Sequence, residues 1–242
     1  MYNLLISCGV AVLLFLLLKF AAGLYWLMSL LIATLAFMGV FYFLSRYIMK
    51  KVAAVMDTAT KDLQAQRVEK GIRELKGAFK YAKWQIYLEG QLNAQIGSIY
   101  YMRRDFSNAF PYLEKSFFKN WVSMGMLAIT YMKRNKPETM RSTFEKAVQG
   151  SPKEPLLWSL YAYCLCEIND QEGAKSILEK GLKKIPGNES LKSNLELLRE
   201  GKKMKMRQFG DMWFQFHLES VGAIQKHHAS AMGAPRRRVI RK

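Results

Sequence analysis

The first 45 residues contain no acidic side chain and only one basic side chain, Lys19. The whole chain of 242 residues has 37 basic and 19 acidic residues and a formal net charge of +18, so nearly all of this charge lies after residue 45. A strongly basic body is attracted to anionic lipid headgroups, nucleic acid or acidic proteins. The sign of the charge does not choose among these partners.

Sequence signatures of catalysis and of cofactor binding are also lacking. The chain has no glycine-rich phosphate loop, no HExxH and no CxxC. Of its three histidines, His227 and His228 lie in a tail without a nearby cysteine or carboxylate, and His217 lies among aromatic residues. We therefore expect no catalytic residue, no metal site and no cofactor, and we expect His217 to be a packing or interface residue.

Cysteine is scarce, with only Cys8, Cys164 and Cys166 in the chain. An odd number of cysteines does not form a disulfide framework. Cys164 and Cys166 are two residues apart on a predicted helix, so their side chains diverge by ~200°. Buried packing is the expected role of these two thiols.

Two long apolar runs occupy the N-terminal segment, over residues 4–18 and 24–44. At ~1.5 Å per residue the second run reaches ~31 Å as a helix, enough to cross a ~30 Å hydrocarbon core. The start lacks the positive charges of a signal peptide. We expect a transmembrane hairpin over residues 1–48 with its turn at residues 19–23. A first helix ending at residue 18 would need a thinned bilayer, and a shallow first helix remains an alternative.

The charges that flank the second run predict its orientation. Arg46, Lys50 and Lys51 follow this run at once, whereas Lys19 is the only charge near its other end. An excess of Lys and Arg marks the cytoplasmic side of a membrane helix. We therefore expect an integral membrane protein whose body and C-terminus face the cytoplasm.

The body after residue 48 shows no alternating β-branched run and is rich in helix-forming residues, which predicts an all-α fold. Residues 49–89 are expected to form an amphipathic helical linker or a leading half-repeat. The chain then repeats itself, because Tyr100 aligns with Tyr131, and Ala128 aligns with Ala162. A period of about 34 residues predicts an α-solenoid over 90–201, including a capping helix.

The repeat resembles the tetratricopeptide repeat, which carries W-x2-L-G-x2-Y, A-x3-F and a later proline. Three degenerate units contribute residues that match this pattern: Gly97, Tyr100, Ala109 and Leu113; Ala128, Tyr131, Phe144, Ala147 and Pro152; Trp158, Ala162, Ala174, Leu178, Gly181 and Pro186. Turn chemistry agrees, because Asn135 and Asn169 fall where paired helices must be separated and Pro137 and Pro155 fit first helical turns.

The resemblance implies a concave groove, lined by the first helix of each unit, that binds a protein partner. Carried onto this chain, it suggests these groove residues: Gln91, Tyr101, Met102, Ile129, Met132, Lys133, Tyr163 and Glu167. The Lys and Asn clamp with which some members hold a terminal carboxylate is not recognisable, because Ala94 and Ser98 occupy groove-facing places.

The C-terminal part is basic. Residues 202–219 are expected to form a basic and aromatic helix, which either lies on anionic lipid or caps the array by burying Trp213 and Phe216. Residues 220–242 are expected to be a disordered tail. The candidates for contact with lipid or nucleic acid are Lys202, Lys203, Lys205, Arg207, Arg236, Arg237, Arg238, Arg241 and Lys242.

These observations favour a membrane-anchored scaffold or adaptor that binds a protein partner through a concave groove. Two alternatives stay open. The chain would be an accessory subunit of a membrane enzyme or transporter if the hairpin made the main contacts, or a membrane-tethered nucleic-acid binder if its basic tail did.

Overall fold

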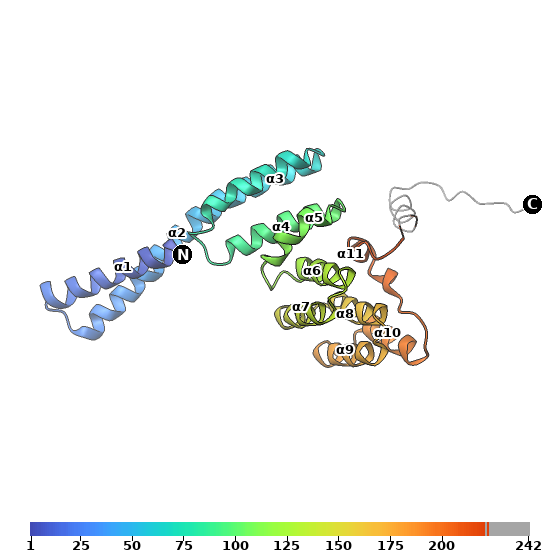
Figure 1. Ribbon diagram of the computed structural model, residues 1–242. Coiled ribbons are helices and arrows are strands. Elements are labelled where there is room, and N and C mark those ends of the chain that lie inside the picture. Colours follow the sequence, from blue (N-terminus) through green and yellow to red (C-terminus); the bar gives the residue numbers. More distant parts are fainter. Residues whose placement is uncertain (221, 223–242) are drawn as a thin grey trace, which may run out of the picture. The chain divides into compact units, whose positions relative to one another are not determined.

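The computed structural model describes residues 1–220 and residue 222, and every regular element in this part of the chain is helical (Figure 1). The predicted all-α class is therefore confirmed for the described residues. The chain divides into two compact units. The first unit comprises residues 1–96 and 115–117, and the second comprises residues 97–114 and the chain from 118 onward.

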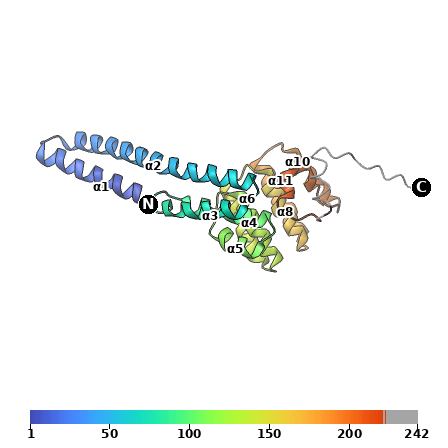
Figure 2. The same cartoon turned by 90° about the horizontal axis from the view of Figure 1, so that it is seen from above.

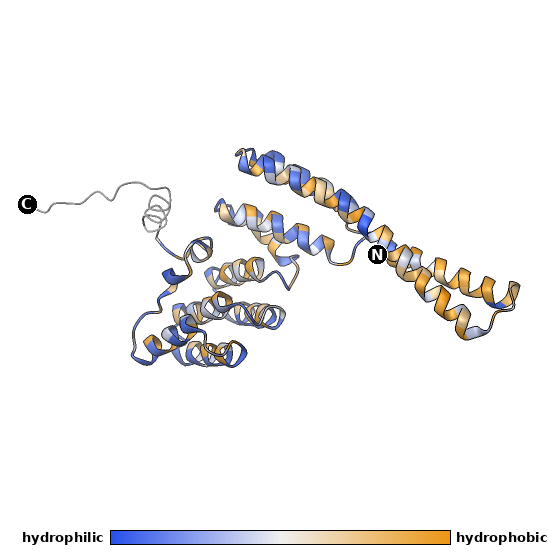
Figure 3. Cartoon of the chain, turned by 180° about the vertical axis from the view of Figure 1, so that it is seen from behind, coloured by the Kyte–Doolittle hydropathy of each residue, from blue (hydrophilic) through white to orange (hydrophobic). Residues whose placement is uncertain are grey.

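The first unit begins with a helical hairpin. Helix α1 spans Tyr2–Leu16 and continues as a π-helical turn over Leu17–Ala21, and helix α2 spans Trp26–Gln64 beside it (Figure 2). Both helices are long and apolar enough to cross a membrane, and Figure 3 shows the apolar residues gathered along them. The 20 helical residues from Tyr2 to Ala21 reach ~30 Å, so the first helix does not have the predicted deficit in length.

The turn of the hairpin covers residues 22–25, so it includes Gly23 as predicted but not Lys19. Lys19 is still helical, and its ammonium group lies 5.1 Å from the centre of the Phe20 ring. Gly23 makes the reversal with a φ of +64°, a conformation that glycine adopts without steric cost. The buried contact between the two helices uses small side chains: Ser7, Ser29 and Ala33.

Helix α2 does not stop at the predicted boundary at residue 48, because residues 46–64 contain neither glycine nor proline. After a tight reversal, helix α3 (Val68–Gly77) packs back along α2. The buried carboxylate of Asp62 lies 2.8 Å from Arg67 and 3.3 Å from Lys70. These two ion pairs hold the reversal closed.

A small core ties the rest of the first unit to α2. The 3₁₀ turn Ala78–Tyr81 follows α3 and leads to helix α4 (Leu88–Met102), whose last six residues belong to the second unit. The buried members of this core are Ile48, Val52, Ala78, Leu88 and Leu92. The segment between α3 and α4 is therefore fixed against α2 at the level of residues 48–52.

The second unit is made of helices joined by short turns (Figure 1). After the end of α4, these helices are α5 (Phe106–Glu114), α6 (Trp121–Lys133), α7 (Pro137–Gly150), α8 (Pro155–Glu167), α9 (Gln171–Lys184) and α10 (Glu189–Arg199). Helix α6 packs on α7, α8 packs on α9, and α10 packs on both α9 and α8.

The predicted turn chemistry is confirmed. Pro137 and Pro155 are the first residues of α7 and α8. Asn135 and Asn169 have φ values of +55° and +64° in the turns before α7 and α9, a region that asparagine tolerates better than most residues. Among the described residues, side-chain oxygens of Asp105, Asn120, Asp170 and Asn188 accept from backbone N–H groups in the first turns of α5, α6, α9 and α10.

Most positions that align from one repeat to the next lie in the core of the second unit, although the aligned Tyr100 and Tyr131 are half-buried. Each of the following is at most 1% exposed: Ala109, Leu113, Ala128, Phe144, Ala147, Ala162, Ala174 and Leu178. Phe144 stacks on Tyr161 with ring centres 4.8 Å apart. The small residues allow helices to approach, and the large ones fill the space between them.

Candidate binding surface of the second unit

The structure divides the eight residues that were predicted to line a groove. Gln91 is exposed and belongs to the first unit, whereas the other seven belong to the second. Among those seven, Tyr101, Ile129 and Met132 are buried, Tyr163 is half-buried, and Met102, Lys133 and Glu167 are exposed. The apolar members of the set are therefore mostly covered.

The chain's own C-terminal segment, which we define as residues 206–219, packs on Tyr101 and Tyr163. The Tyr101 hydroxyl donates a hydrogen bond to the carbonyl of Phe216 at 2.9 Å. The rings of Tyr163 and Trp213 meet edge to face, with centres 5.0 Å apart. Gly125 of α6 leaves room for the Phe216 ring, since a Cβ there would lie 3.2 Å from it. The face that sequence reasoning assigned to a partner thus holds an intramolecular occupant.

The prediction of one helix over residues 202–219 is wrong. The segment contains a 3₁₀ turn, Met206–Phe209, and the single-turn helix α11, Asp211–Phe214. Gly210 separates them with a φ of +57° and a ψ of −139°, which ends the helical path. Trp213 and Phe216 are 1% and 0% exposed, as the capping alternative requires.

Polar contacts hold both ends of the C-terminal segment. The backbone N–H of Lys205 donates to the side-chain oxygen of the buried Asn194 at 2.8 Å. The guanidinium group of Arg207 donates two hydrogen bonds to Glu219, at 3.1 and 2.9 Å. These bonds, with a smaller contribution from the indole N–H of Trp213, lower the pKa of Glu219. The segment is therefore an ordered part of the unit.

His217 fits the packing role that the sequence predicted. Its ring stacks on Tyr101 with centres 5.8 Å apart, and its Nε2 lies 3.1 Å from the carbonyl oxygen of Met102. Burial lowers the pKa of His217, and the charge of Arg104 lowers it further, whereas hydrogen bonds to the backbone oppose the shift. The folded unit therefore prefers the neutral imidazole.

This preference predicts that the C-terminal segment loosens in mild acid. A depressed folded-state pKa leaves stability intact above the unfolded value of about 6.5 and removes it as the pH falls through the folded value. Relative to the intrinsic exchange rate at each pH, we expect hydrogen exchange in residues 206–219 to quicken between pH 7.5 and pH 5.5. His217→Gln should flatten this dependence, because glutamine does not titrate. Equal acceleration in the variant would show that another group is responsible.

Beside the covered residues an open cleft of about 1040 Å³ remains, which we call the basic cleft. Its cationic side chains are Lys175, Lys202, Lys203, Lys205 and Arg207, and its carboxylates are Glu167 and Glu219. Five cations and two anions leave a net charge of +3. Apolar side chains line it as well: Tyr163, Leu197, Leu198, Met204 and Met206. The structure thus brings four predicted basic contacts together with Tyr163 and Glu167.

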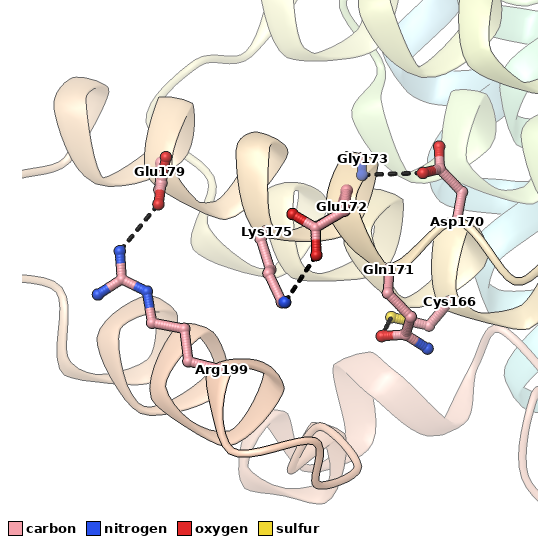
Figure 4. Close-up of polar contacts among 8 residues, drawn as sticks. All are labelled: Cys166, Asp170, Gln171, Glu172, Gly173, Lys175, Glu179 and Arg199. Atoms are coloured by element: carbon pink, nitrogen blue, oxygen red, sulfur yellow. Dashed lines mark hydrogen bonds and ion pairs between the residues drawn. The ribbon is translucent and has the colours of Figure 1, made fainter.

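Residues of helices α9 and α10 line part of the basic cleft, and Figure 4 shows ion pairs made by these two helices. Arg199 of α10 pairs with Glu179 of α9 at 2.8 Å, and Lys175 pairs with Glu172 at 2.8 Å. In the described part of the chain, neither Lys203 nor Lys205 has a carboxylate within ion-pairing distance. Their two ammonium charges are available to an anionic ligand.

Lys175 is the cationic residue of the cleft that sequence reasoning missed. It lies on the second helix of its pair, and the whole of α10 separates it from Lys205 along the chain, so no local spacing connects the two lysines. Only the path of residues 200–207 past α10 brings them to one cleft.

The thiols of the second unit are unreactive in this setting. Burial raises the pKa of Cys166 to about 11 and raises that of the fully buried Cys164 even further, so both are protonated at neutral pH. Among the described residues, no group of three or more His, Cys, Asp or Glu side chains could hold a metal ion.

The remaining predicted sites lie outside the described residues. They comprise Arg236, Arg237, Arg238, Arg241 and Lys242 of the predicted tail, and His227 and His228, where we expected no site, lie outside the described residues as well. Comparison of the chain with protein-family models, with curated proteins and with solved structures finds no match. The functional argument therefore depends on the chain itself.

Proposed function

We propose that the protein is a membrane-anchored adaptor that holds an acidic segment of a partner protein in the basic cleft. In this proposal the hairpin of α1 and α2 crosses the membrane, and the second unit is a solenoid resembling tetratricopeptide repeats in the cytoplasm. The protein performs no catalytic step, and its task is to keep a partner at the membrane surface.

The charge around the hairpin supports this orientation. Arg46, Lys50 and Lys51 follow the apolar part of α2, and the turn at the other end has only Lys19 nearby. The excess of basic residues favours the cytoplasm for the side that leads into the body. The first helix begins on this same side, because α1 runs antiparallel to α2 and lies beside it (Figure 2).

The repeat supports the solenoid. The pairs α6–α7 and α8–α9 are each built from two helices of 13 and 14 residues, and most of their aligned positions are buried. Gly181 lies against Trp158, where the resemblance expects a small residue to admit a large one. Helix α10 then covers the last pair, as a terminal helix of a repeat array does.

The basic cleft is the observation that carries the proposal. Its net charge of +3 and its unpaired Lys203 and Lys205 favour an anionic ligand, and its leucine and methionine side chains favour apolar groups beside those charges. A volume of about 1040 Å³ lies at the upper end of the range for ligand pockets and suits a short peptide. A flat bilayer surface could not enter a concavity of this kind, so acidic protein is the better match.

Anchoring makes a cleft of modest affinity effective. A binder confined to the membrane meets a partner in the same membrane at a high effective concentration, so that no large interface is needed. Two unpaired lysines and a few apolar contacts can therefore be enough to hold a partner at the membrane.

The proposal is tested by photocrosslinking in native membranes from position 203. We expect a crosslinkable residue in place of Lys203 to capture segments rich in Asp and Glu, and Lys205→Glu in the same chain to reduce the yield at least fivefold. The matched control places the crosslinker at the exposed Lys180 of α9, away from the cleft lining. Capture of nucleic acid at position 203, or capture only from positions in the hairpin, would contradict the proposal. The second result would favour an accessory subunit instead.

A further inference from the structure

The chain returns to the beginning of α1 after more than 80 residues. The backbone N–H of Tyr2 donates to the carbonyl of Lys83 at 2.9 Å, and the side chain of Asn3 donates to the Gln85 side chain at 3.2 Å. The Tyr2 and Trp84 rings meet edge to face with centres 5.3 Å apart. The first turn of a helix has N–H groups without intrahelical acceptors, and residues 83–85 supply partners for this one.

These contacts fix the depth of residues 83–85 in a membrane. Helix α1 with its π-turn is about as long as the hydrocarbon core is thick, so a crossing helix has its first residues at the surface. Residues bonded to Tyr2 and Asn3 then lie at that surface too. The core that joins Ile48 and Val52 to Ala78 holds this segment at the matching level of α2.

The composition of the returning segment suits this depth. Residues 79–87 read FKYAKWQIY, with four aromatic side chains, two lysines and no acid. Lys80, Lys83 and Tyr87 are exposed, whereas Tyr81 and Trp84 are half-buried. Tyr and Trp prefer the boundary between hydrocarbon and headgroups, and lysine is attracted to anionic lipid there.

Helix α2 adds basic and aromatic groups just beyond its apolar stretch. Arg46 donates a hydrogen bond to the Tyr42 hydroxyl at 3.2 Å, and the ammonium group of Lys51 lies 5.5 Å from the centre of the Tyr47 ring. The first acidic residue of the chain is Asp57, so no carboxylate of α2 competes for these cations before that point.

We propose that residues 78–87, together with residues 46–51, form a headgroup belt that binds anionic phospholipid at the membrane surface. The first unit then contacts the membrane at a third segment besides the two helices of the hairpin. The α2–α3 hairpin leaves the surface and brings the chain back to it. This inference rests on the hairpin crossing the bilayer, which is one part of the proposed function, and it is independent of the basic cleft.

Lipid selectivity of the full-length protein in vesicles tests the charge of the belt. The probe is spin-labelled phosphatidylglycerol compared with spin-labelled phosphatidylcholine, and the readout is the fraction immobilised by the protein. We expect Lys80→Glu with Lys83→Glu to lower the preference for phosphatidylglycerol by roughly fivefold per lysine. The matched control, Lys180→Glu with Lys183→Glu, changes the net charge equally at exposed positions of α9 and should leave the preference unchanged.

Depth is measured separately with a fluorophore on a cysteine at position 83, after replacement of the three native cysteines by serine. Lipids that carry a quencher near the headgroup should reduce the emission of this fluorophore more than lipids that carry the quencher near the bilayer centre. A fluorophore at the exposed Lys192 of α10 provides the comparison. Carbonate extraction reports anchoring independently. If the protein is anchored but the fluorophore at position 83 is not quenched and the lipid selectivity of the variant is unchanged, the headgroup belt is disproved and the adaptor proposal is unaffected. Binding of position 83 to an acidic protein instead of lipid would have the same consequence.

Discussion

Trp213→Ala is expected to destabilise the second unit by about 3–5 kcal/mol, the usual cost of removing a large aromatic side chain from a packed core. Trp213 is 1% exposed and packs edge to face on Tyr163. Its indole N–H also donates to Glu219 at 3.2 Å. The cavity would form at the contact between the C-terminal segment and α8, so the loss should spread into that helix.

Hydrogen exchange of the full-length protein, followed peptide by peptide, measures this loss within one unit. Faster exchange is expected in residues 206–219 and in α8, with exchange in α1 and α2 unchanged. Met212→Ala is the matched control, because Met212 is the neighbour of Trp213 and is 46% exposed. Equal effects of the two substitutions would show that the C-terminal segment does not hold the unit together.

Because the C-terminal segment packs on the predicted groove, it limits which of the groove residues a partner can contact. A partner could take over the hydrogen bond of the Tyr101 hydroxyl only if the C-terminal segment left, and this would expose Trp213 and Phe216 to water. Burying a side chain of this size contributes about 1.5–3 kcal/mol, so leaving has a large cost. The basic cleft needs no such displacement, since Lys203 and Lys205 are already exposed.

Local patterns predicted the elements of this chain well. Apolar runs without charge predicted α1 and the first part of α2, because a continuous apolar stretch long enough to span a bilayer is rare outside membrane helices. Asparagine predicted the turns before α7 and α9, and proline predicted the starts of α7 and α8, because their backbone preferences act within one or two residues. The buried small residues followed from the repeat period, since equivalent positions of a repeat meet equivalent neighbours.

Contacts between distant segments could not be predicted from these patterns. The hydrogen bond from Tyr101 to Phe216 joins residues 115 apart, and the one from Asn3 to Gln85 joins residues 82 apart. Neither pair has a periodic relation in the sequence. Composition did suggest that residues 202–219 either cap or touch lipid, but it could not reveal that Gly210 divides the segment or that Lys175 would share a cleft with Lys205.

Gly181→Val is expected to destabilise the pair formed by α8 and α9 by about 1–3 kcal/mol, the range for overpacking a core. A Cβ at position 181 would lie 2.9 Å from Cγ and 3.1 Å from Cβ of Trp158, where no flexible end of a side chain can move aside. Gly181→Ala should cost less, because the helix propensity of alanine exceeds that of glycine by about 1 kcal/mol and offsets part of the clash. Thermal unfolding and hydrogen exchange in α8 and α9 measure both effects.

Combining Gly181→Val with Trp158→Ala shows whether the two positions act through one contact. Trp158→Ala alone removes the ring and its indole hydrogen bond to the carbonyl of Pro152, and leaves a cavity. Valine at position 181 would fill part of that cavity, so the double variant should be more stable than the sum of the single effects predicts, by about 0.5–3 kcal/mol. If the two effects on stability were strictly additive, the contact with Trp158 would not require glycine at position 181. The requirement matters because the same contact sets how closely α8 and α9 approach, and α9 supplies Lys175 to the basic cleft.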